Sequence, residues 1–150
     1  MGDVANIEKQ LLAVFPQRVV DGPIAPHDCD ECRSLRDNLA GITWVDVPSE
    51  FVNSNDDVLP LLSHDAYLAF LPAWLRQGVR DPGGNLANML LVNLGHHPNT
   101  TGFTRRQAAL VIEVAAFIAQ SNVFGLTDPV NVESMAEIAR VWKGVGKSAA

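Results

Sequence analysis

Residues 104–120, TRRQAALVIEVAAFIAQ, decide the fold class of this chain. The middle of the segment is apolar nearly all round, and three polar residues recur every seven positions: Arg106, Glu113 and Gln120. That period puts the polar side chains on one narrow stripe. The segment therefore predicts a buried central helix with a single wet edge, that is, one strip of its surface exposed to solvent. Thr104 followed by Gln107 resembles a capping box that opens this helix.

Helical periodicity extends over most of the chain on both sides of this segment. Apolar residues spaced three and four apart predict a helix at residues 4–15, which ends before Pro16. The same spacing predicts a helix at residues 86–94 that Gly95 closes. Three further helices should begin at polar caps: Asp28, Ser63 and Asn131.

The same rules predict details within these helices. Gly41 should end the helix that Asp28 starts. Pro72 should kink or restart the helix that Ser63 starts, because proline lacks an amide donor. The last helix should turn four residues inward: Val132, Met135, Ala139 and Trp142.

No pair of strands competes with this helical pattern. Residues 43–47 (TWVDV) alternate like a strand, but they have no second strand of comparable quality. We therefore expect an extended connector that is anchored by Trp44. Since 47% of residues are hydrophobic, the chain can bury a core. We expect an all-α, irregular bundle of about six helices in a single domain over residues 1–150.

Charge limits the classes of partner. The chain has 11 basic and 17 acidic residues and a net charge of −6. Nucleic acid and membrane surfaces are not expected as partners, because both require a basic face. The charge is local, since residues 21–57 contain nine acids and two bases. Such a face attracts another protein with a basic surface, and five acids are expected to contact it: Asp28, Asp30, Glu31, Asp56 and Asp57.

The sequence predicts a cytoplasmic protein. Its N-terminus lacks the basic region and apolar run of a secretory signal. The longest stretch of low charge, residues 108–121, is well short of the roughly 20 residues that a membrane helix needs.

The two cysteines belong to a cluster that favours metal binding. His27, Cys29 and Cys32 supply three zinc ligands within six residues. A fourth ligand would be water or a distant histidine: His64, His96 or His97. The cluster thus resembles the local half of a zinc site.

Two other interpretations of the cysteines compete with zinc. If Asp28 caps the helix, both thiols share its apolar face with Leu35 and Leu39, as ordinary core residues do. A disulfide-exchange site is disfavoured, because the neighbouring acids oppose formation of a thiolate. Those acids are Asp28, Asp30 and Glu31.

Three segments, residues 27–39, 44–51 and 59–75, carry a specific pattern. The His-x-Cys-x-x-Cys opening is followed by Trp44, Pro48 and Phe51, then by LPLLS and FLPAWL. This combination resembles a family of small bacterial proteins of unknown function. The resemblance implies a bacterial cytosolic origin and assigns no catalytic residue.

Hydrolase, P-loop and dinucleotide-binding motifs are missing from the sequence. The leading hypothesis is therefore a non-enzymatic protein that binds another protein, as an inhibitor or immunity-type partner. The second hypothesis is a zinc-binding or other metal-binding domain that uses His27, Cys29 and Cys32; no other cofactor is expected. The third is an enzyme whose site is assembled from distant loops, such as those around His64 and His96.

Overall fold

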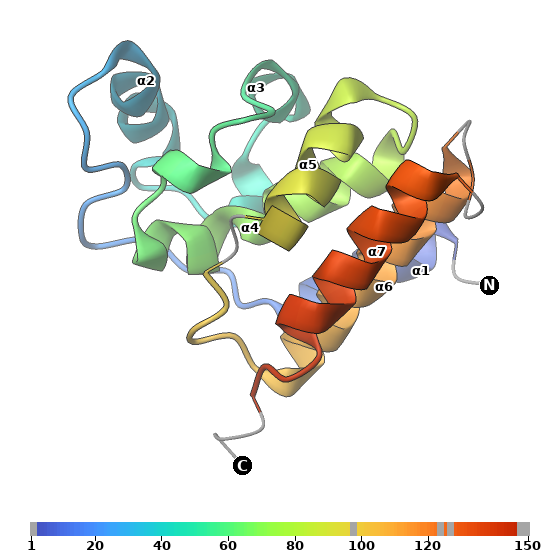
Figure 1. Ribbon diagram of the computed structural model, residues 1–150. Helices are drawn as coiled ribbons and strands as arrows, with labels where there is room; N and C mark the ends of the chain where they lie inside the picture. Colours follow the sequence, from blue (N-terminus) through green and yellow to red (C-terminus); the bar gives the residue numbers. More distant parts are fainter. Residues whose placement is uncertain (1–2, 97–98, 123–124, 126–127, 147–150) are drawn as a thin grey trace.

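The computed structural model describes residues 3–96, 99–122, 125 and 128–146. Within these residues the chain is all α, which confirms the predicted irregular helical bundle. Seven α-helices and two 3-10 helices are present there: α1 (Val4–Val14), α2 (Asp30–Leu39), η1 (Trp44–Asp46), α3 (Ser49–Ser54), η2 (Leu59–Leu61), α4 (His64–Arg80), α5 (Asn85–His96), α6 (Arg105–Ser121) and α7 (Pro129–Trp142) (Figure 1). None of these helices has the length and apolar character that crossing a membrane requires.

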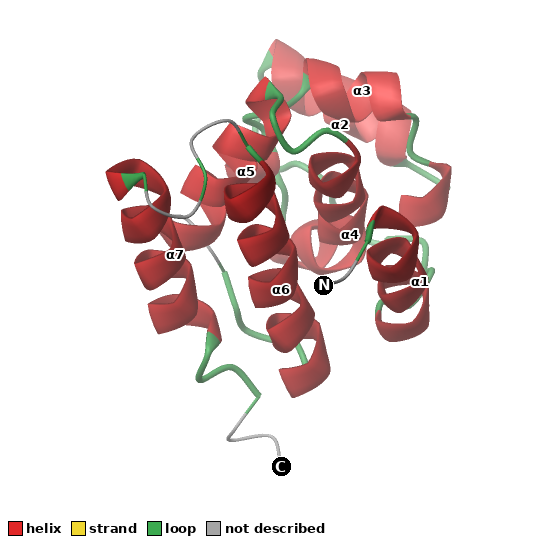
Figure 2. Ribbon diagram, turned by 90° about the vertical axis from the view of Figure 1, so that its right-hand side faces the viewer, coloured by secondary structure: helices red, strands yellow, loops and turns green. Residues whose placement is uncertain are grey.

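Helix α4 lies at the centre of the bundle. It packs against α1, α3, α5, α6 and η1, and every residue from 69 to 75 is buried. The prediction that α6 is the central helix is therefore wrong, although its wet edge is confirmed: Arg106, Glu113 and Gln120 are all exposed. Helix α6 contacts α7 on one side and α1 on the other (Figure 2).

The proline in α4 does not interrupt it. Ser63 caps the helix as predicted, since its hydroxyl accepts a hydrogen bond of 3.2 Å from the Ala66 N–H. The helix then continues through the buried Pro72 to Arg80, so the predicted restart is wrong. Packing along the whole length of α4 outweighs the single amide hydrogen bond that proline removes.

The predicted boundaries of α5 and α7 are each displaced. Gly95 lies inside α5, where a Cβ atom would come within 3.2 Å of the Glu137 Cβ atom in α7. This glycine permits close packing of two helices and does not end α5. The cap of α7 is Asp128, whose carboxylate accepts from the Val130 N–H. Val132, expected to face inward, is 52% exposed.

Asn131 is not a cap because its amide is used elsewhere. It is buried, and its Nδ2 donates to the main-chain oxygens of Ala119 at 3.2 Å and Gly125 at 2.7 Å. These bonds connect α7 to the end of α6. The inner face of α7 therefore runs through Asn131, Ile138 and Trp142.

Residues 43–47 are anchored by a fully buried Trp44, as predicted, but the middle three, Trp44–Asp46, form the 3-10 helix η1 where an extended connector was expected. The cause lies in α4. The Arg76 guanidinium donates to the main-chain oxygens of Val45 and Val47, each at 3.3 Å. It also lies 5.2 Å from the Trp44 ring centroid. One cation thus satisfies carbonyls that a strand would have paired with another strand.

Candidate functional site: the cysteine pair and the acidic surface

Cys29 is the N-cap of α2, so the predicted cap at Asp28 is wrong. Its sulfur accepts a hydrogen bond of 3.3 Å from the Cys32 N–H, and the helix begins at Asp30. The Asp28 carboxylate is turned instead toward Arg33, at 3.7 Å. Because a cap lies outside the helical face, the prediction that both thiols lie on the apolar face fails for Cys29.

The two thiols differ in their exposure. Cys29 is exposed, whereas Cys32 is completely buried together with Leu35 and Leu39. The interpretation of a core cysteine is therefore confirmed for Cys32 alone. One cysteine of the pair is thus exposed to solvent, and the other lies in the core.

Their pKa values shift in opposite directions. Hydrogen bonds from the thiol and the N–H of Cys32 lower the pKa of Cys29, and the nearby Glu31 carboxylate opposes this effect. Burial raises the pKa of Cys32, and its contact with Cys29 raises it further. The exposed thiol is consequently the one that ionises more readily.

The predicted third zinc ligand, His27, has an exposed side chain. Its main-chain oxygen accepts a 2.8 Å hydrogen bond from Arg36 in α2. Among the described residues, no three His, Cys, Asp or Glu side chains are grouped as a metal site. The zinc hypothesis stays a prediction that metal analysis can test.

The five predicted partner-binding acids fall into two groups. Asp28, Asp30 and Glu31 lie at the start of α2, where the first two are paired with Arg33. Asp56 and Asp57 follow α3 and line a hollow of about 200 Å³, here called the acidic hollow. Its other walls come from η2 and α5: Leu59, Pro60, Met89, Val92 and Asn93.

The predicted histidines lie on different elements. His64 lies in the first turn of α4 with its Nδ1 atom buried and without a hydrogen-bond partner in the described structure. His96 ends α5 and is exposed, and His97 lies outside the described residues. The hypothesis of an enzyme site assembled around His64 and His96 stays a prediction.

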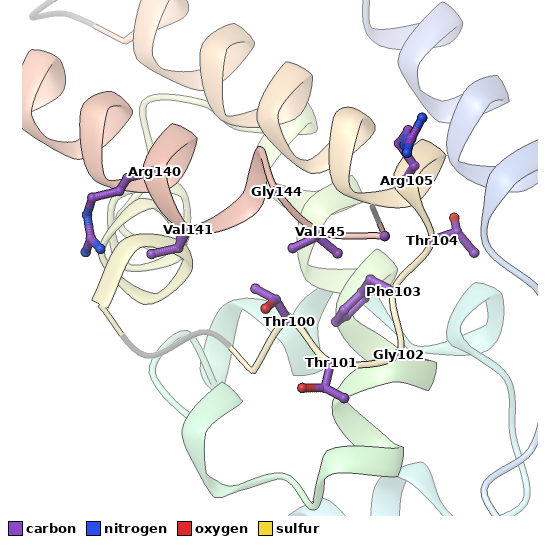
Figure 3. Close-up of a pocket in the computed structure, with 11 residues that line it drawn as sticks. Thr100, Thr101, Gly102, Phe103, Thr104, Arg105, Arg140, Val141, Gly144 and Val145 are labelled. Atoms are coloured by element: carbon purple, nitrogen blue, oxygen red, sulfur yellow. The ribbon is translucent and has the colours of Figure 1, made fainter. Parts of the chain in front are cut away.

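A larger hollow of about 830 Å³ lies between residues 100–105 and the end of α7. Neither His64 nor His96 lines it, and Figure 3 shows Arg105 and Arg140 on opposite sides of it. Sequence reasoning missed this hollow, because its threonines and glycines carry no motif. It also missed the walls of the acidic hollow, which are joined only by folding.

No protein-family model, curated protein or solved structure matches this chain. The resemblance to a family of small bacterial proteins stays a prediction, and the candidate site rests on its own residues.

Proposed function

We propose that this protein acts without catalysis, by binding another protein that presents a basic surface to residues 21–57. The two basic side chains of this segment, Arg33 and Arg36, already have partners within the protein. Arg33 pairs with Asp28 and Asp30, and Arg36 donates to the main-chain oxygen of Ala25 at 2.7 Å. The other seven acids have no ion-pair partner within the described residues: Asp21, Glu31, Asp37, Asp46, Glu50, Asp56 and Asp57.

The observation that carries the proposal is the acidic hollow. Two carboxylates stand at apolar walls, and neither lysine nor arginine lines the cavity. Asn93 adds a buried Oδ1 atom with no hydrogen-bond partner in the described residues. A Lys or Arg side chain fits this chemistry, because its stem packs on apolar surface while its charged end meets carboxylates.

Apolar surface next to the hollow extends the proposed contact. Val92 is 43% exposed and also lines a second hollow of about 250 Å³, which Val130 and Asp128 share. Val130 is 69% exposed. We therefore expect the partner to present basic side chains beside an apolar one, since protein interfaces combine an apolar centre with a charged rim.

Within this proposal, the protein is an inhibitor or immunity-type partner that covers a basic site on another bacterial protein in the cytoplasm. Negative charge gathered on one face speeds encounter with such a site and excludes acidic proteins. The binding should therefore weaken as salt is added, because exposed charges are screened.

Affinity capture followed by calorimetry tests the proposal. The bait is the full chain, compared with the double variant Asp56→Asn/Asp57→Asn. The control is Glu113→Gln/Glu133→Gln, because these acids are exposed on α6 and α7. A partner should bind wild type and control alike, and bind the Asp variant at least about tenfold more weakly. Equal binding by all three chains, or no partner together with turnover of a small molecule, would refute it.

A further inference from the structure

We propose that Cys29 and Cys32 form a dithiol site that exchanges with disulfides of positive or no net charge. The inference is independent of the protein-binding proposal, because it rests on the start of α2 and not on the acidic hollow. Helix α2 lies at the end of the molecule far from α7 (Figure 1). Cys29 is exposed there, so a substrate can reach it from solvent.

Disulfide exchange requires an attacking thiol and a resolving thiol, and the geometry suits Cys29 to the first role and Cys32 to the second. An attacking thiol must reach solvent, and Cys29 is exposed at the cap of a helix of 10 residues. A resolving thiol must reach the attacking sulfur while it is sheltered from other reagents, and Cys32 is 0% exposed. The 3.3 Å hydrogen bond from the Cys32 N–H to the Cys29 sulfur holds the pair together.

The local charges permit this chemistry, although the sequence alone argued against it. Asp28 and Asp30 are paired with Arg33. Of the three neighbouring acids, Glu31 alone has no ion-pair partner within the described residues. Because the Cys32 N–H in the first turn of α2 donates to the Cys29 sulfur, the helix favours the thiolate at this position.

The exchange balances with the substrate disulfide as the oxidant. The Cys29 thiolate attacks one sulfur of the substrate, so that a mixed disulfide forms and the other half leaves as a thiolate, which takes up a proton from water. Cys32 then loses its proton to solvent and attacks the Cys29 sulfur. The Cys29–Cys32 disulfide forms, and the second half leaves as a thiol. Two electrons have passed from the protein to the substrate.

The acids around the pair select the substrate. Asp30 is exposed over 94% of its side chain and Asp28 over 91%, and Glu31 is also exposed. Anionic disulfides such as glutathione disulfide approach a negative surface slowly, whereas cationic ones approach it quickly. We therefore expect cystamine to react faster than bis(2-hydroxyethyl) disulfide, and glutathione disulfide to react slowest.

Rapid-quench mass spectrometry of the reduced full chain tests the proposal with these three probes. Wild type should lose two hydrogen atoms and gain a Cys29–Cys32 link. Cys32→Ser should accumulate one adduct at Cys29, while Cys29→Ser, which keeps a capping side chain, should react at least about tenfold more slowly. Failure to form the link, or glutathione disulfide reacting fastest, would overturn the proposal.

A measurement on wild type covers the case in which Cys32→Ser does not fold. A small amount of iodoacetamide, followed by peptide mapping, should modify Cys29 well before Cys32. Modification of Cys32 first would overturn the assignment of roles. A full equivalent of zinc held by both thiols would overturn the proposal as well, because metal-bound sulfurs are no longer free to exchange.

Discussion

The indole N–H of Trp142 donates a hydrogen bond of 2.8 Å to the main-chain oxygen of Leu94. Leu94 lies in the last turn of α5, where carbonyls have no main-chain donor ahead of them in the helix. A side chain from the end of α7 thus completes the end of α5. Trp142 is fully buried, and its ring meets Phe103 edge-on at 5.1 Å between centroids.

Trp142→Phe should destabilise the protein by about 2–4 kcal/mol, because it opens a cavity and leaves the Leu94 carbonyl without its donor. The matched control is Trp44→Phe. Trp44 is equally buried, but its N–H has no hydrogen-bond partner in the described residues. Urea unfolding should show a smaller loss for the control. A loss at Trp44 as large as that at Trp142 would contradict the role of the hydrogen bond.

Tyr67 is the single tyrosine of the chain, so its ionisation can be followed directly by ultraviolet absorbance. Burial raises the pKa of Tyr67 well above its ordinary value. In the folded protein, phenolate absorbance should therefore be missing at pH 10–11, whereas in denaturant it should appear near pH 10. Phenolate absorbance that rises near pH 10 in the folded protein would show that Tyr67 is accessible to water.

The same shift predicts a loss of stability in alkali. Above pH 10 the unfolded chain releases the Tyr67 proton while the folded chain keeps it, so the free energy of unfolding falls by up to roughly 1.4 kcal/mol per pH unit. Tyr67→Phe removes this contribution. Since the buried hydroxyl has no partner among the described residues, Phe should cost little at pH 7. If the free energy of unfolding fell equally with pH in wild type and in Tyr67→Phe above pH 10, the prediction would be contradicted.

Local sequence signals located six of the seven α-helices in the described residues and missed the short α3. Contacts between distant segments decided whether Asn131 serves as a cap. Thr104 and Gln107 form the predicted capping box, because both partners lie within one turn. Asn131 is also a good cap by residue type, yet its amide is drawn into bonds with Ala119 and Gly125. Such competition between a local and a distant partner is invisible to a pattern of neighbours.

The candidate site, like the helix caps, is only partly visible in the sequence. The spacing of Cys29 and Cys32 is visible in the sequence, whereas their different exposure depends on where α2 begins. The acidic hollow joins Asp57 to Met89, two residues that only folding brings to one cavity. A periodicity argument finds the carboxylates and cannot find the apolar walls that make them a site.

Metal analysis separates the zinc hypothesis from the dithiol site. Because the described residues group no third ligand with the two sulfurs, we expect less than about a tenth of an equivalent of zinc in protein purified without added metal. The control is protein dialysed against zinc and then passed over a desalting column. A full equivalent that is lost in His27→Ala would establish the zinc site instead.

A side chain at Gly78 would have to displace the ends of two buried side chains, because this glycine lies in α4 where α4 packs against α5 and α6. A Cβ atom there would lie 2.9 Å from both Ile118 Cδ1 in α6 and Leu90 Cδ2 in α5. Overpacking costs about 1–3 kcal/mol, against a gain of about 1 kcal/mol that alanine brings to a helix. Ile118 and Leu90 are both held in the core, so we expect the cost to be the larger of the two. Gly78→Ala should therefore lower the free energy of unfolding in urea, whereas Gly83→Ala, with open space around it, should change it little.

A double-mutant cycle tests whether the clash is the cause. Ile118→Val removes one of the clashing atoms, so it should lower the free energy of unfolding less in the Gly78→Ala background than in wild type. Equal costs in both backgrounds would show that the clash is relieved elsewhere.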